Sequence, residues 1–231
     1  MYKPLLPVIT IFLLLFCLNI PLRAETAPPA PQQTAARLQA RIDTIKSLSF
    51  NFYQQTRGEL TGRPKKGSGK AVFLKNNGRG LMRWDYIAPD RQVLVSDGKI
   101  FSMYFEKLHQ MIVTPAEKLK NDLTYSFFIG NSRLMDDFHI LQPDPDIAGN
   151  TEGMSVIKLI PKIPHAQIES IHLWVTDDSL IRRITLLDHF GTETILSFSD
   201  IKIDPLKEID DKTIRKIFSF SPPEGTEIIE Q

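Results

Sequence analysis

The chain has 231 residues, of which 42% are hydrophobic and 24% are charged. These proportions are typical of a folded globular protein and exclude a disordered or collagen-like chain. Lys and Arg number 28 and Asp and Glu number 27, which gives a formal net charge of +1. Because affinity for a phosphate backbone requires an excess of basic residues, this balance excludes a general electrostatic affinity for nucleic acid, and we expect no nucleic-acid partner.

Residues 1–24 predict an export signal rather than a part of the fold. Lys3 precedes an apolar run from Leu5 to Ile20, and Pro21-Leu22-Arg23 then leads to the small residue Ala24. This order is typical of a secretory signal peptide, which we expect to be cleaved near Ala24. An uncleaved membrane anchor is the alternative, but the run is shorter than the roughly 20 residues that span a bilayer.

The only cysteine, Cys17, lies inside this apolar run, so the exported chain would contain no thiol and no disulfide. Lipidation of Cys17 would require small residues before it, whereas Leu15 and Phe16 stand there. Residues 25–33 are rich in Pro and predict an extended, flexible leader. We therefore expect the ordered domain to occupy residues 34–231.

Residues 34–46 predict an amphipathic helix, because Ala35, Leu38, Ile42 and Ile45 recur at spacings of three and four. From Leu48 onward the apolar period becomes two, and short β-rich segments follow at intervals of about ten residues. The predicted strands are 48–56, 69–75, 80–87, 91–96, 99–105, 109–113, 138–142, 154–160, 168–176, 180–188, 193–202 and 216–221. This spacing predicts an antiparallel meander in a mainly β protein with few helices (α+β).

Two features interrupt or join these strands. Asp97-Gly98 predicts a hairpin, because a type I′ turn needs positive φ at both of its central residues. Residues 115–129 predict a helix or helix pair, with a second short helical piece around 131–137. Because these few helices cannot cover both faces of a sheet of about eleven strands, we expect the sheet to curl with the helices on its concave side.

Residues that could carry out catalysis or bind metal do not form a recognisable motif. The five His residues lack metal-binding spacing. The pairs Asp136/Asp137, Asp177/Asp178 and Asp210/Asp211 are interpreted as caps or turns. Residues 62–70 resemble a phosphate loop only superficially and predict a solvated basic hairpin loop that could dock a partner. The sequence therefore predicts neither a metal nor another cofactor, and it favours a carrier or binding function over an enzyme.

Large apolar side chains are in excess, with 14 Phe, 6 Met and 2 Trp. Strand alternation places Leu48, Phe50 and Phe52 on one face, and Met82 and Trp84 on one face of another strand. A solid β core packed on helices would explain this, but an apolar cavity fits better because short helices cannot cover so much apolar lining. The candidate lining residues are Leu38, Ile42, Leu48, Phe50, Phe52, Met82, Trp84, Met103, Leu119, Leu123, Phe127, Phe128, Trp174 and Phe198.

Three segments resemble one known family. They are Leu48–Gln55 after the amphipathic helix, Arg83-Trp84 followed by Val93–Lys99, and Phe218–Gly225, which reads Phe-Ser-Phe-Ser-Pro-Pro-Glu-Gly. In this order and spacing they resemble the periplasmic outer-membrane lipoprotein carrier family, LolA, from about Ala35 to the C-terminus.

The resemblance implies a single incomplete antiparallel β-barrel of about eleven strands with a helical lid over a hydrophobic cavity. It also implies a periplasmic monomer that carries acylated lipoproteins from an inner-membrane ABC-type transporter to an outer-membrane receptor. We place the lid at residues 115–138, where it would carry Leu119, Leu123, Phe127, Phe128 and Leu134.

The family also has an Arg after its second strand that latches the lid, and Arg79 is the nearest candidate here. Two alternatives to the carrier stay open: a half-barrel that binds another lipid, and a sensor or scaffold that uses the same fold for protein contact.

Overall fold

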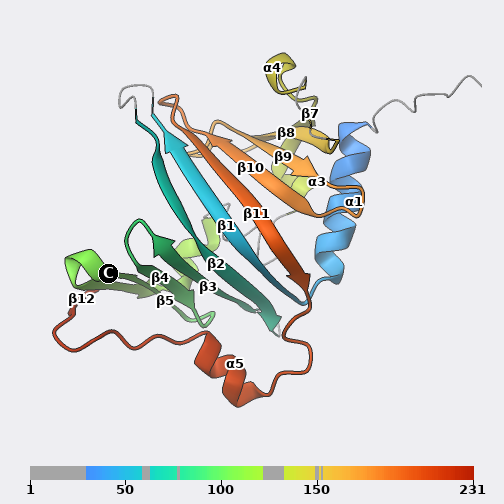
Figure 1. The fold of residues 1–231 in the computed structure, drawn as a ribbon. Coiled ribbons are helices and arrows are strands. Elements are labelled where there is room, and N and C mark those ends of the chain that lie inside the picture. The colour runs from blue at the N-terminus through green and yellow to red at the C-terminus, as the bar shows by residue number, and fades with distance from the viewer. Residues whose placement is uncertain (1–29, 59–62, 77–78, 122–132, 149–150, 152) are drawn as a thin grey trace, which may run out of the picture.

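The computed structural model describes residues 30–58, 63–76, 79–121, 133–148, 151 and 153–231, which form one twelve-stranded sheet (Figure 1). The strand order is β12-β6-β5-β4-β3-β2-β1-β11-β10-β9-β8-β7, so the sheet is open, as an incomplete barrel requires. Neighbouring strands are antiparallel except β12, which pairs with β6 in parallel. The strands are β1 Ser47–Arg57, β2 Lys65–Asn76, β3 Arg79–Ala88, β4 Gln92–Ser96, β5 Ile100–Phe105, β6 Gln110–Pro115, β7 Phe138–Leu141, β8 Ser155–Pro161, β9 Ser170–Val175, β10 Ile181–Leu187, β11 Glu193–Ile203 and β12 Glu227–Glu230.

The helices are few and mostly short. They are α1 Pro31–Thr44, η1 Glu106–Leu108, η2 Ala116–Asn121, α3 Leu134–Asp137, α4 Pro145–Ala148 and α5 Asp211–Ile217. In the part of the chain that the structure describes, none of them has the length and apolar content needed to cross a bilayer. The described structure is therefore mainly β, as the alternation of apolar and polar residues in the sequence predicts.

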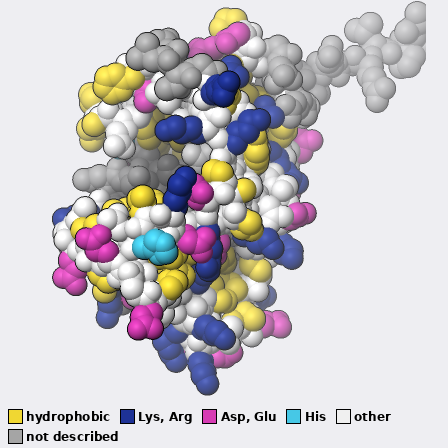
Figure 2. Space-filling model, turned by 60° about the vertical axis from the view of Figure 1, so that its left-hand side comes forward, with side chains coloured by type: hydrophobic (Ala, Val, Ile, Leu, Met, Phe, Trp, Pro, Cys, Tyr) yellow, Lys and Arg dark blue, Asp and Glu magenta, His cyan; other side chains and the backbone are white. Residues whose placement is uncertain are grey.

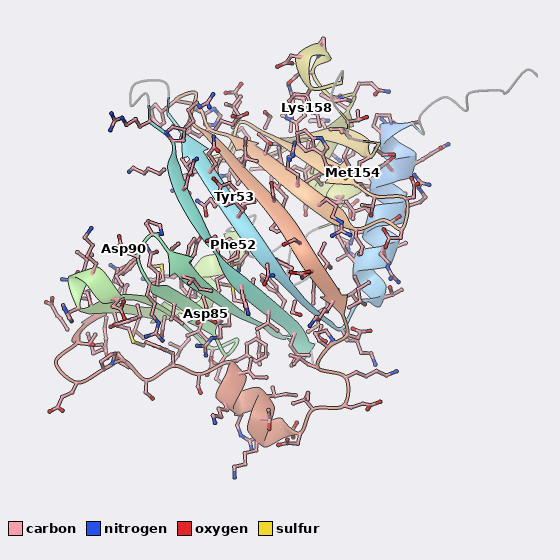
Figure 3. The ribbon with its side chains drawn as sticks, viewed as in Figure 1. Phe52, Tyr53, Asp85, Asp90, Met154 and Lys158 are labelled. Atoms are coloured by element: carbon pink, nitrogen blue, oxygen red, sulfur yellow. The ribbon has the colours of Figure 1, made fainter. Side chains whose placement is uncertain are left out.

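Side-chain alternation gives the sheet two different faces. Phe52 and Tyr53 are neighbours on β1, but Phe52 is 3% exposed and Tyr53 is 43% exposed (Figure 3). The main core lies on the side of Phe52, which we call the concave face, and α1 packs over it at β7 and β8. On the face that Figure 2 shows, Lys and Arg side chains are interspersed with Asp and Glu.

Helix α1 begins at Pro31, three residues before the predicted start. Proline suits the first turn of a helix, because its missing N–H would have no partner there. The helix buries Pro31, Thr34, Ala35 and Leu38 against the sheet, so the ordered structure includes part of the predicted leader.

Residues 204–226, which we call the C-terminal strap, cross the opposite, convex face before the chain joins the edge of the sheet as β12. Phe220 of the strap packs on a second apolar cluster formed by Val93, Val95, Tyr104 and Met111, and its ring centroid lies 5.0 Å from that of Tyr104. Phe218 is also buried. Arg83 Nη1 donates to the carbonyls of Ile217 and Ser219, at 2.9 and 3.0 Å, and so anchors the strap.

The predicted strand 216–221 is wrong, because α5 ends at Ile217 and the next residues lie on the sheet instead of joining it. The extended segment 218–220 has Phe at every second residue, which is the same apolar period of two that a strand has. The strand of this region is β12, which begins only at Glu227.

The hairpin at Asp97-Gly98 is confirmed, but with a different turn. Gly98 has φ 82°, whereas Asp97 is not in the positive-φ region. Asp97 Oδ1 instead accepts the N–H groups of Lys99 and Ile100, each at 2.8 Å, in a three-residue loop. The Asp side chain therefore supplies the hydrogen bonds that a second left-handed residue would otherwise arrange.

The interpretation of the aspartate pairs as caps and turns is confirmed for one member of each pair. Asp137 Oδ2 accepts the N–H of Arg133 at the start of α3, and Asp210 Oδ1 accepts the N–H of Thr213 at the start of α5. Asp178 accepts the Thr176 hydroxyl in the β9–β10 turn. Each carboxylate thus satisfies a local donor.

Candidate functional site

An aromatic surface runs across the concave face over four adjacent strands. Phe50 lies 4.6 Å from Phe198 and 5.9 Å from Phe73 between ring centroids, and Phe52 lies 4.7 Å from Trp84. Large side chains at the same face of β1, β2, β3 and β11 thus form one continuous apolar patch. Such a surface suits a ligand that is long and apolar.

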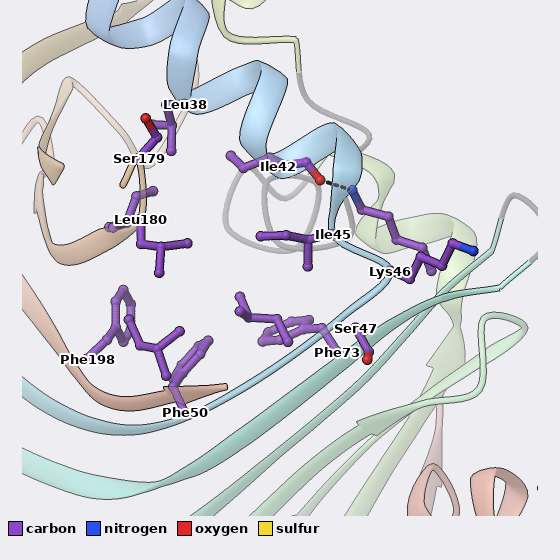
Figure 4. A pocket seen from close by; sticks show the side chains of 14 residues that line it. Leu38, Ile42, Ile45, Lys46, Ser47, Phe50, Phe73, Ser179, Leu180 and Phe198 are labelled. Carbon is purple, nitrogen blue, oxygen red and sulfur yellow. Dashed lines mark hydrogen bonds between the residues drawn. The ribbon is translucent and has the colours of Figure 1, made fainter. Parts of the chain in front are cut away.

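A pocket separates this patch from the C-terminal half of α1 (Figure 4). The cavity volume is about 50 Å³, enough for a few water molecules at most. Its walls are mainly apolar side chains, with Lys46, Ser47, Lys75 and Ser179 as the polar exceptions. The full lining is Leu38, Ile42, Ile45, Lys46, Ser47, Leu48, Phe50, Phe73, Lys75, Ser179, Leu180, Ile181, Phe198 and Ile201.

Lys75, near the end of β2, holds the C-terminus of α1 at the edge of this pocket. Its Nζ donates to the carbonyl of Ile42 at 2.6 Å, and its backbone N–H donates to the carbonyl of Lys46 at 2.8 Å (Figure 4). A cation is favourable here because the last carbonyls of a helix carry partial negative charge. Partial burial lowers the pKa of Lys75, against the opposing influence of Asp43 and Asp204.

Asp204 fixes the turn between α1 and β1 on the other side of the pocket. Its Oδ1 accepts the N–H groups of Lys46 and Ser47, at 2.8 and 2.9 Å. The hydrogen bond from Ser47 is the main reason that the pKa of Asp204 lies below its usual value. The end of α1 is thus fastened by both Lys75 and Asp204, which lie far from it in sequence.

Most predicted lining residues that can be placed come together in the main core. Its buried members include Leu38, Phe50, Phe52, Met82, Trp84, Leu134 and Phe198, and the half-buried Ile42, Leu48 and Met103 pack against it. The side chains of Arg79 and Leu119 lie outside the described part of the structure, as do residues Leu123, Phe127 and Phe128.

Trp174 is an exception, because it lies on the convex face. Its neighbours Leu173 and Val175 belong to the main core, and Trp174 itself stacks with the guanidinium of Arg183 at 5.2 Å. All six residues of β9 are buried, so burial and apolar character do not reveal which face a residue takes. The prediction for Trp174 is therefore corrected.

Three parts of the site are absent from the sequence prediction. Phe73 had a usable signal, because it alternates with Ala71 on a predicted strand. Lys75 and the β9–β10 turn at Ser179–Ile181 carried no signal, since their role depends on contacts with α1. Among the described residues, no group of three His, Cys, Asp or Glu side chains could hold a metal ion.

Residues 43–211 match the model of the family "Outer membrane lipoprotein carrier protein LolA". The outer-membrane lipoprotein carrier protein of Methylococcus capsulatus is 30% identical over 95% of this chain and 96% of its own. That of Nitrosomonas europaea is 29% identical, over 87% of this chain and 92% of its own.

A solved structure of a LolA superfamily protein from Nitrosomonas europaea is 14% identical, with a TM-score of 0.43, and covers 83% of this chain and 98% of that one. The match to the family model covers most of the sheet and the pocket, and the sequence relatives extend over nearly the whole chain. The chain belongs to the LolA family of outer membrane lipoprotein carrier proteins.

Proposed function

We propose that this protein is a periplasmic chaperone that shields the acyl chains of lipoproteins on its concave face. It receives them from an ABC-type transporter in the inner membrane and delivers them to a receptor in the outer membrane. The continuous aromatic surface over β1, β2, β3 and β11, with a pocket under α1, carries this proposal. The names of its sequence relatives support the cargo and the compartment.

The need for such a carrier follows from the cost of exposing lipid to water. Each buried CH₂ group contributes about 0.8 kcal/mol, so one sixteen-carbon chain costs on the order of 12 kcal/mol in water. A carrier that covers these chains must also release them. Release follows when the receptor binds them more strongly than the carrier does, so no hydrolysis and no cofactor is required in the carrier.

The small pocket indicates how the carrier works. A volume of about 50 Å³ cannot take an acyl chain, so loading must move α1 away from the aromatic patch. When cargo leaves, α1 covers the patch again and regains the buried apolar contacts. The closed empty state thus favours unloading, and Lys75 contributes to that closed state through Ile42.

The test is uptake of an environment-sensitive apolar dye by the exported chain and its displacement by an acylated peptide. We expect Phe50→Glu to abolish dye uptake, because an unpaired charge on the apolar patch costs several kcal/mol. Tyr53→Glu is the matched control, since Tyr53 is on the same strand but faces outward. Normal uptake by a folded Phe50→Glu variant, or equal loss in both variants, would refute the cavity.

A native mass spectrum of protein isolated from its own periplasm identifies the cargo. We expect the mass of a triacylated peptide or of a whole lipoprotein bound to one copy of the chain. A free phospholipid or glycolipid bound instead would show that the half-barrel carries another lipid. A dimer would contradict the expectation of a monomer.

A further inference from the structure

Three hairpin ends lie side by side at the end of the sheet away from the pocket. They are the β8–β9 loop 162–169, the β10–β11 loop 188–192, and the ends of β1 and β2 at Arg57 and Arg63–Lys66. Together we call them the hairpin rim. The loops are joined because His189 Nε2 lies 2.9 Å from the carbonyl oxygen of His165, and Arg57 pairs with Glu193 in the ladder of β1 and β11.

The two most exposed large apolar side chains in the described part of the chain belong to this rim. Ile163 is 83% exposed and Phe190 is 82% exposed. Both loops have backbone hydrogen bonds that hold them: Asp188 Oδ1 accepts the N–H groups of Phe190 and Thr192, at 2.8 and 2.7 Å, and the N–H of Lys162, next to Ile163, donates to the carbonyl of Asp137 at 2.9 Å. The apolar tips are therefore presented by an ordered turn and are not buried by folding.

Charge on the rim is predominantly basic. Among its described residues and Glu193 beside it, five Lys or Arg stand against three Asp or Glu. Two of the three acids have a neighbour that lessens their effect: Asp188 accepts backbone N–H groups, and Glu193 is the ladder partner of Arg57, whereas Glu169 is exposed. Lys65 and Lys66 are exposed and have no ion pair to another described residue, although they stand opposite Thr56 and Gln55 within the sheet.

We propose that the hairpin rim is a peripheral contact site for an anionic lipid bilayer. Protruding apolar tips with neighbouring Lys and Arg are the combination that binds such surfaces: the side chains enter the boundary between headgroups and acyl chains while the cations attract anionic lipid. A protein partner that seats Phe190 in a pocket is the alternative outcome, and its binding would not depend on anionic lipid. This inference goes beyond the carrier function and does not depend on it.

The position of the rim makes the contact compatible with cargo exchange. Strand β1 runs from Ser47, which lines the pocket, to Arg57 on the rim, and an eleven-residue strand extends about 35 Å. A molecule resting on a bilayer through its rim would hold the pocket well away from the lipid surface. The pocket then stays accessible to a protein that hands over or accepts cargo.

The experiment uses the exported chain without cargo and measures its co-sedimentation with lipid vesicles. One set contains phosphatidylcholine alone and the other contains about one third phosphatidylglycerol, at low and at roughly 0.15 M ionic strength. We expect binding to the anionic vesicles that weakens with salt, and little binding to the neutral ones. Equal binding to both sets, or no binding to either, would overturn the proposal.

Variants separate the rim from the lipid-binding patch. Phe190→Ser should weaken binding to the anionic vesicles about tenfold, and Lys65→Ser with Lys66→Ser should weaken it about fivefold or more. Leu108→Ser is the matched control, since Leu108 is 60% exposed on another hairpin, and it should have no effect. All of these variants should bind the apolar dye normally, which distinguishes a failed rim from a failed cavity.

A direct readout comes from Phe190→Trp. Insertion of the new indole into the headgroup region should shift its emission to shorter wavelength and allow quenching by brominated lipid. Leu108→Trp should show neither change. Unchanged emission from Phe190→Trp on anionic vesicles would refute the contact even if the protein sediments with them.

Discussion

At the scale of single residues, Gly69 allows the strands under the aromatic patch to approach each other closely. A Cβ added at Gly69 would lie 1.9 Å from the backbone oxygen of Asp85, closer than any real contact, whereas at Gly67 it would only touch the ring of Tyr86 at 3.3 Å. Gly69 also faces Phe52 across the β1–β2 ladder. The close approach of β2 and β3 at this point therefore depends on the missing side chain.

We expect Gly69→Ala to lower the free energy of unfolding by about 3 kcal/mol, because backbone must shift to relieve the clash. Gly67→Ala should cost less than about 1 kcal/mol, since an aromatic ring can move by a few tenths of an ångström. Urea unfolding of both variants measures the difference. Equal stabilities would show that β2 and β3 separate without cost at Gly69.

Lys75 gives a second prediction at this scale. Lys75→Met keeps the aliphatic stem but removes the hydrogen bond to the Ile42 carbonyl, so the closed state should weaken. If the closed, empty state loses roughly 1 kcal/mol of stability, the open state that binds the dye becomes more populated. Dye binding should then be about fivefold tighter, and transfer to an acceptor should be slower.

Lys70→Met is the control, because Lys70 lies on the same strand but is exposed. Unchanged dye affinity in Lys75→Met would assign the latch to another residue, and Arg79→Leu then tests the position that the family resemblance indicates.

At the scale of elements, α1 and α3 pack together over the main core. The N–H of Leu134 donates to Gln39 Oε1 of α1 at 2.9 Å, and Arg133 lies 3.8 Å from Asp43 of the same helix. Leu134 itself is fully buried in the main core. The end of the segment that we propose as the lid is thus attached to α1, so the two should move together.

Hydrogen exchange tests this coupling. On loading with an acylated ligand, we expect faster exchange at the Leu134 amide and in 115–138, and unchanged protection around Phe50 and Trp84 in the strands. Gln39→Leu should produce part of this change without ligand, whereas Gln33→Leu on the exposed side of α1 should not. Unchanged exchange in 115–138 on loading would refute the lid.

At the scale of the whole molecule, the convex face is also covered, by the C-terminal strap at one side and by residues 142–148 after β7 at the other. Asp144 of this segment lies 2.7 Å from Lys158 Nζ and 3.2 Å from His172 Nε2, and His172 is 4% exposed. Burial is the main cause that lowers the pKa of His172, and Lys158 acts in the same direction, while Asp144 and Asp146 oppose it.

A histidine whose pKa is lower in the folded than in the unfolded protein favours folding when it is neutral. The unfolded chain then binds more protons below about pH 6.5, so stability should fall as the pH falls from there towards the folded pKa. We expect His172→Gln to lose this part of the pH dependence, measured by urea unfolding between about pH 7.5 and 5. His139→Gln, at an exposed position on β7, is the control. An unchanged pH profile in His172→Gln would contradict the assignment.

The sequence by itself determined the strands, the amphipathic helix and most of the aromatic patch. Alternation along a strand with one exposed face is a local property, so Phe50, Phe52 and Trp84 could be assigned to one side before any contact was known. The same rule failed where both faces are covered, at Trp174, and where an extended strap imitates a strand, at Phe218 and Phe220. Period two alone does not distinguish these cases.

Only the tertiary structure decided how the patch is closed. Lys75 meets Ile42 across 33 residues, and Asp204 meets Lys46 across 158, so neither contact leaves a mark on the local pattern. The volume of the pocket likewise depends on how closely α1 approaches β1, β2 and β11, which is set by packing of side chains from all four elements. Local periodicity encodes which residues face the core, whereas the fit between distant elements fixes the space that remains between them.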